Sequence, residues 1–176
     1  MATEQSLYRK IQLVLEVAQS VRATTLTELH KEIEERELPN FLTYQYDEVK
    51  DEFSWRQSAK VIRKTVRLCC RLGLLNSDGR HTPVGRQALR RTRYDKILGQ
   101  QARLVLERHQ VVLSDLNPII QSSLQSDPPV LPTAIQLWEA VKPDVGKADF
   151  SRLLTLLSNC GAAESSQKKI YLHIVT

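Results

Sequence analysis

SWRQSAKVIRKTVRLCCRLGLLNSDGRHTPVGR, residues 54–86, is the stretch of the chain that indicates its fold. We predict that Ser54 caps a long helix over Trp55–Leu72, because apolar residues recur along it at helical spacing. Placed at about 100° per residue, six basic residues gather on the side away from the apolar face. They are Arg56, Lys60, Arg63, Lys64, Arg67 and Arg71. The helix is therefore expected to pack on one side and to present an uninterrupted basic stripe on the other.

The residues that follow predict a tight hairpin and the start of another helix. Gly73 ends the long helix, and Asp78-Gly79 between short extended runs is typical of a hairpin turn. Thr82 followed by Pro83 is typical of a helix start, because threonine caps the helix and proline needs no hydrogen-bonded N–H there. The next helix is expected to carry a row of arginines on one face: Arg86, Arg90 and Arg93.

Two helices and a connection are expected upstream of this stretch. Apolar residues in Leu7–Val21 follow the helical period. Thr25 and Glu28 have the spacing of a capping box for a second helix, which Pro39 stops. The segment Phe41–Phe53 combines aromatic residues with an acidic cluster, and we interpret it as a connection with at most a helical turn or two.

The second half of the chain predicts more helices and a β-prone tail. Ser126-Asp127-Pro128-Pro129 is the clearest break in the sequence. Helices are expected over 99–109, 115–124 (capped by Ser114), 132–141 and 147–159, the last ended by Gly161. In the tail, Ser165-Ser166 is interpreted as a turn before the β-prone run 170–175. The fold class expected is mainly α with short β-hairpins.

The leucine-glycine-leucine step at 72–74, the Asp78-Gly79-Arg80 turn and the Thr82-x-x-Gly-Arg helix start resemble the winged-helix superfamily of DNA-binding proteins. In that superfamily a recognition helix runs into a β-hairpin wing. The resemblance covers Leu7 to about Arg93. Residues 132–175 are similar in element order alone, with 147–159 as third helix and 163–175 as wing. The resemblance implies tandem winged-helix-like units, which we place at 1–96 and 97–176.

Charge is distributed very unevenly between these regions. Residues 55–96 hold twelve Lys and Arg against two Asp, whereas the whole chain has a formal net charge of +5. Residues 1–54 hold six basic and eleven acidic residues, and residues 97–176 hold seven of each. A surface of one sign attracts a polyanion, so the basic region predicts a nucleic-acid partner.

The function we predict is non-enzymatic binding of double-stranded DNA, as a transcription regulator or as a subunit of a DNA-processing complex. A helix can enter the major groove while its other face stays packed. Residues near the start of the helix (Arg56, Gln57 and Lys60) are then nearest the base edges, and the later ones meet phosphates. Arg80 at the wing tip is placed to reach the backbone or the minor groove. Arg86 and Arg90 either extend this surface or only solubilise their helix.

An alternative function is a protein–protein scaffold whose basic face meets an acidic protein. The acidic residues upstream could complement the basic helix within the chain or across a dimer, in competition with nucleic acid. They are Glu32, Glu34, Glu35, Glu37, Asp47, Glu48, Asp51 and Glu52. Two other interpretations concern the last four of these residues, which could form a solvated acidic turn or a divalent-metal site. The neutral region 97–176 suits other protein subunits or a second copy, for instance through its C-terminal strand.

No motif for catalysis, cofactor binding or metal binding was found in the sequence. Cys69, Cys70 and Cys160 lack zinc-site or disulfide-framework spacing, and the histidines are scattered. We therefore expect no enzyme activity, no cofactor and no metal. The cysteine usage, the missing signal peptide and the missing run of about 20 apolar residues predict a cytoplasmic protein without a membrane partner.

Overall fold

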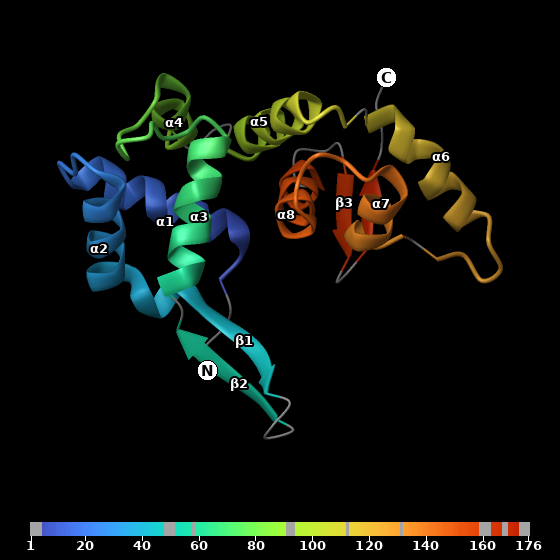
Figure 1. Cartoon of the computed structure of the whole chain (residues 1–176), viewed down its shortest axis with the longest axis horizontal. Helices are drawn as coiled ribbons and strands as arrows, with labels where there is room; N and C mark the ends of the chain where they lie inside the picture. Colours follow the sequence, from blue (N-terminus) through green and yellow to red (C-terminus); the bar gives the residue numbers. More distant parts are fainter. Residues whose placement is uncertain are drawn as a thin grey trace. The chain divides into compact units, whose positions relative to one another are not determined.

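The computed structural model describes residues 5–47, 52–57, 59–90, 94–111, 113–130, 132–158, 163–166 and 169–172. The chain divides into two compact units, Met1–Arg90 (unit 1) and Arg91–Thr176 (unit 2). Within the described residues both units are mainly helical, as the sequence predicts, and each contains one two-stranded sheet (Figure 1).

The first two helices of unit 1 begin where their capping residues predict. Helix α1 spans Leu7–Ser20 and α2 spans Leu26–Glu37. The backbone N–H of Glu28 donates to the hydroxyl of Thr25, which satisfies one of the free donors at the start of α2. The Glu28 carboxylate accepts from the backbone and hydroxyl of Thr24. The expected capping box is therefore modified: the Glu28 carboxylate binds the backbone N–H of Thr24 instead of that of Thr25.

The core of unit 1 lies between α1, α2, the 3-10 turn η1 (Leu38–Phe41) and helix α3 (Ala59–Arg71), which pack against one another. Each helix contributes its apolar stripe, since burying that stripe is the main gain of packing. The fully buried side chains include Ile11, Leu15, Leu29, Ile33, Phe41, Ile62 and Val66.

The segment between α2 and α3 forms a β-ribbon, and here two sequence predictions are wrong. Strands β1 (Leu42–Asp47) and β2 (Glu52–Gln57) pair antiparallel. The expected connection over 41–53 is thus a strand in part, and the expected helix start at Trp55 lies in β2. Helical spacing of Trp55 with Ala59 suggested a longer helix, whereas the two-residue alternation of aromatic and polar residues favours strands.

The turn after α3 agrees with the predicted hairpin but is shorter. A single bridge joins Leu75 and His81. Gly79 has a φ of 85°, the left-handed backbone that glycine adopts without strain. Thr82 then caps α4 (Pro83–Ala88), and its hydroxyl accepts from the N–H of Gly85, which confirms the predicted helix start.

The described residues of unit 2 form four helices and a small sheet. They are α5 (Tyr94–Arg108), α6 (Leu113–Leu124), α7 (Ala134–Val141), α8 (Lys147–Ser158), β3 (Ala163–Ser166) and β4 (Lys169–Leu172). Helix α8 packs against α5, α7 and both strands, and its Phe150 and Leu154 are fully buried.

Three local predictions in unit 2 need correction. Ser114 lies inside α6 rather than at its cap, because the helix begins at Leu113, two residues before the predicted start. Helix α7 begins at Ala134 rather than at Pro132, and its N-cap Thr133 forms a full capping box with Gln136. Ser165 and Ser166 belong to strand β3 rather than to a turn. The predicted helix end at Gly161 lies outside the described residues.

None of the helices in the described part of the chain combines the length and the apolar character that crossing a bilayer needs.

Candidate nucleic-acid interface

Helix α3 has a buried apolar side and an exposed basic side. Its buried residues are Ile62, Thr65, Val66, Leu68 and Cys69. Its five exposed basic residues are Lys60, Arg63, Lys64, Arg67 and Arg71. At about 100° per residue these five fall within an arc of about 100°. Five of the six residues predicted for the basic stripe therefore share one exposed face, which we call the α3 basic face.

The α3 basic face carries no acidic residue of its own helix, since α3 contains neither Asp nor Glu. Lys60, Arg63, Lys64 and Arg67 form no ion pair with any residue that the structure describes. A helix face that only solvates a protein usually mixes both signs of charge for support at i,i+4. Within the described residues, no ion pair therefore offsets the positive charge of Lys60, Arg63, Lys64 and Arg67.

Arg56 and Gln57 were predicted on the same helix, and this prediction is wrong. Both lie in β2, where Arg56 is paired in register with Thr43 and Gln57 with Leu42. They precede α3 in the chain, and they are not part of the α3 basic face. Lys60 is therefore the first residue of the α3 basic face along the helix.

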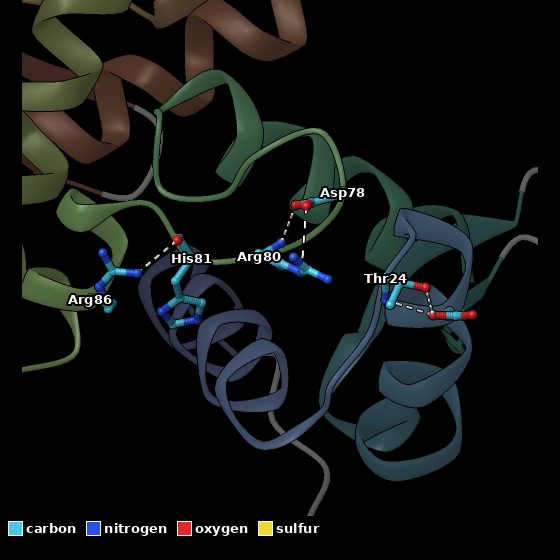
Figure 2. Close-up of polar contacts among 6 residues, drawn as sticks. Thr24, Asp78, Arg80, His81 and Arg86 are labelled. Atoms are coloured by element: carbon cyan, nitrogen blue, oxygen red, sulfur yellow. Dashed lines mark hydrogen bonds and ion pairs between the residues drawn. The ribbon is translucent and has the colours of Figure 1, made fainter.

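Arg80 is exposed at the turn, but its charge is partly offset by a neighbour. The Asp78 carboxylate accepts from the Arg80 backbone N–H at 2.9 Å, and it lies 3.7 Å from the Arg80 guanidinium (Figure 2). This side chain is 64% exposed, so the pair is weak in water. The pairing follows from the turn itself, because aspartate accepts from the N–H two residues later.

The predicted arginine row on one helix does not form. Arg86 lies in α4 and donates to the His81 carbonyl at 3.3 Å (Figure 2), while Arg90 lies in the turn after α4. Arg93 lies outside the described residues. Arg86 and Arg90 are both exposed, and they add positive charge to unit 1 from two different local structures.

The turn is anchored to α1 by His81. Its Nε2 lies 2.8 Å from the carbonyl oxygen of Leu15, so a neutral ring with the proton on Nε2 donates to that oxygen. Burial is the main cause that lowers the pKa of His81; the bond to the Leu15 carbonyl opposes this effect, and the charge of Arg86 lowers the pKa further. The net effect favours the neutral ring, which still makes the bond to Leu15.

His30 on α2 lies next to the α3 basic face and was not singled out by sequence analysis. Burial lowers its pKa, and the charges of Arg63 and Arg67 lower it further, against an opposing effect of Glu34. Its Nε2 is buried, and no described group lies within hydrogen-bond distance of it. A lone histidine in a helix gives no sequence signal for such a position.

The acidic residues of α2 have local partners. Glu32 pairs with Arg36 and Glu35 pairs with Lys31 at i,i+4 spacing. Glu37 accepts from the amide of Asn40. Among the described residues, none of these three glutamates forms an ion pair with the α3 basic face. Glu34 acts electrostatically on His30, as do Arg63 and Arg67 of that face. Of the acidic cluster at 47–52, residues 48–51 lie outside the described residues.

The cysteines of α3 are suited to packing rather than chemistry. Burial raises the pKa of the Cys69 thiol far above its ordinary value. The pKa of Cys70 is also raised, by burial and then by the charge of Asp78. Thiols in this state are poor nucleophiles and poor metal ligands. In the described residues, no group of three His, Cys, Asp or Glu side chains is placed to hold a metal ion.

The two lowered histidine pKa values predict that the protein loses stability in mild acid. In the unfolded chain the histidines have a pKa of about 6.5. As the pH falls below this value, the unfolded chain therefore binds more protons than the folded chain. We expect the free energy of unfolding to fall as the pH drops from about 7.5 to 5.5. Urea unfolding followed by circular dichroism measures this. The His30→Gln and His81→Gln double variant should show a flatter dependence, and an unchanged slope would contradict the assignment.

Comparison of the chain with protein-family models, with curated proteins and with solved structures found no significant match.

Proposed function

We propose that the protein is a non-enzymatic binder of double-stranded DNA and that the α3 basic face is its main contact surface. The observation that carries this proposal is the α3 basic face itself: five exposed Lys and Arg residues in a helix without acidic residues. The opposite side of α3 is buried in unit 1, so the helix can meet a duplex without unfolding its domain.

The roles within the interface follow from position along α3. Lys60 is nearest the helix start and is assigned to base edges or the first phosphates, and Arg63, Lys64, Arg67 and Arg71 to phosphates. Arg80, partly offset by Asp78, makes a weaker backbone contact. Arg86 and Arg90 extend the positive surface of unit 1 and strengthen long-range attraction.

The order of elements in unit 1 supports a winged-helix-like interpretation. Helices α1, α2 and α3 are followed by the short turn closed by the Leu75 and His81 bridge, although η1 and the β1–β2 ribbon are inserted between α2 and α3. In unit 2, helices α6 to α8 are followed by the pair β3 and β4. We propose that unit 2 holds protein partners, as in a transcription regulator or a DNA-processing complex.

A salt titration with a random-sequence duplex tests the proposed function. If the α3 basic face neutralises about five phosphates, log affinity should fall with log salt at a slope of about −4.5. The affinity is then expected to drop about 500-fold between about 50 and 200 mM salt. Fluorescence anisotropy of a labelled duplex measures this. A chain that does not bind at low salt, or whose affinity ignores salt, would contradict the proposal and favour the protein scaffold.

A further inference from the structure

His30 of α2 carries a buried ring nitrogen without a partner. Its Nε2 is buried, and among the described residues no group lies within hydrogen-bond distance of it. Buried polar atoms nearly always have a hydrogen-bond partner, so an unpaired one needs a physical explanation. A proton on this nitrogen would have no acceptor in the described structure. The free protein therefore favours the neutral ring, which can keep its proton on Nδ1 and avoid a buried, unpaired N–H.

Three charged residues act on the His30 ring, and they lie on two helices that pack against each other (Figure 1). Glu34 is one turn further along α2, whereas Arg63 and Arg67 are i,i+4 neighbours on the α3 basic face. Helix α1 and η1 also pack against α2, but the described charges that act on the ring come from α2 and α3. The two arginines oppose a proton on the ring, and Glu34 favours it.

A phosphate that binds Arg63 and Arg67 changes this balance. Both side chains are exposed and form no ion pair with any residue that the structure describes. The negative charge of a phosphate offsets theirs, so the arginines no longer oppose a proton on His30. Charges act over several ångströms at a partly buried site, and the phosphate therefore need not touch the ring. A proton on the ring would also offset the Glu34 carboxylate, which otherwise repels the duplex.

We infer that His30 couples duplex binding to the uptake of one proton: its ring is neutral in the free protein and becomes charged when phosphates pair with Arg63 and Arg67. This inference rests on the proposed function, because the phosphates are those of the bound duplex. Binding and protonation strengthen each other by the same factor. A duplex that favours the charged ring must therefore bind more tightly as the pH falls, since protonation is then easier.

Fluorescence anisotropy of the full chain with a labelled random-sequence duplex tests the coupling. At constant salt, we expect the wild-type affinity to rise about 5-fold between about pH 7.5 and about pH 6.0. His30→Gln, whose side chain does not titrate, should change by less than about 1.5-fold over the same range. The matched control, His81→Gln, removes the other histidine whose pKa is lowered and should keep the increase. Circular dichroism checks that all three chains are folded at both pH values.

Nuclear magnetic resonance titration of the His30 ring tests the geometry in the free protein, without DNA. Arg63→Gln with Arg67→Gln removes both charges that oppose the proton and should raise the pKa of His30. The matched control, Lys60→Gln with Lys64→Gln, removes the same amount of charge from the α3 basic face and should leave that pKa unchanged. A pKa that responds equally to both pairs would overturn the assignment of the coupling to Arg63 and Arg67.

The outcomes separate the coupling from the proposed function. Duplex binding with a steep salt dependence but no effect of pH would overturn the coupling and leave the proposed function standing. A pH dependence that survives in His30→Gln would do the same. Absence of duplex binding at either pH would overturn the proposed function and the coupling with it.

Discussion

A chain in which Lys60, Lys64 and Arg67 are all replaced by glutamate is expected to bind duplex DNA at least about 100-fold more weakly than the wild type. Each replacement removes one positive charge from the α3 basic face and adds a negative one next to the phosphates. Fluorescence anisotropy with the random duplex at low salt measures the loss. The slope of log affinity against log salt should also become shallower, because fewer counterions are released.

The folded state should tolerate this triple replacement. The three side chains are exposed, and they form no ion pair with any residue in the described ranges. The matched control is Lys96→Glu with Arg108→Glu and Lys142→Glu, three exposed positions in unit 2. Both variants lower the formal net charge by the same amount. Equal loss of binding in the control would show that net charge, and not the α3 basic face, determines affinity.

Replacement of Gly85 by alanine is expected to destabilise unit 1 by at least about 3 kcal/mol, the upper end of the usual cost of overpacking. A Cβ at this position would lie 2.0 Å from the carbonyl oxygen of Leu74 and 3.0 Å from its carbon. Both atoms belong to the backbone, so no side-chain rotation relieves the clash. The same carbonyl oxygen accepts from the Thr82 N–H at 3.1 Å, and any shift would disturb this bond too.

Urea unfolding of the full chain measures the effect, with Gly146→Ala as the control. An added Cβ at Gly146, just before α8, meets nothing within 4 Å. We expect Gly146→Ala to change the free energy of unfolding by less than about 1 kcal/mol. A Gly85→Ala chain as stable as the control would show that α4 does not approach Leu74 as closely as described.

Much of unit 1 could be predicted because its signals are local. Caps such as Thr25 and Thr82 act on the next three residues, and the apolar stripe of α1 repeats within one helix. The ribbon could not be predicted this way, since strand pairing joins residues that are distant along the chain. Its alternation of Tyr44, Tyr46, Phe53 and Trp55 was a usable signal. The acidic residues between them and the helical spacing after Trp55 pointed elsewhere.

Sequence analysis predicted the site residues that lie on α3 well, and it predicted the residues of neighbouring elements less well. Lys60, Arg63 and Arg67 were placed correctly because helical geometry fixes which residues share a face. Arg90 was misplaced because α4 ends at Ala88, and element ends are weakly encoded. The proximity of His30 to the α3 basic face depends on how α2 packs against α3, which no single helix reveals.

The bond between His81 and Leu15 has a consequence for the order in which the protein folds during synthesis. It joins groups 66 residues apart, and α1 also packs against α3. A nascent chain that ends at Leu75 still lacks the segment that meets the end of α1. A chain that has emerged to Arg90 contains every element of unit 1. We therefore expect unit 1 to close late in its own translation yet before unit 2 is complete, so that each unit folds without competition from the other.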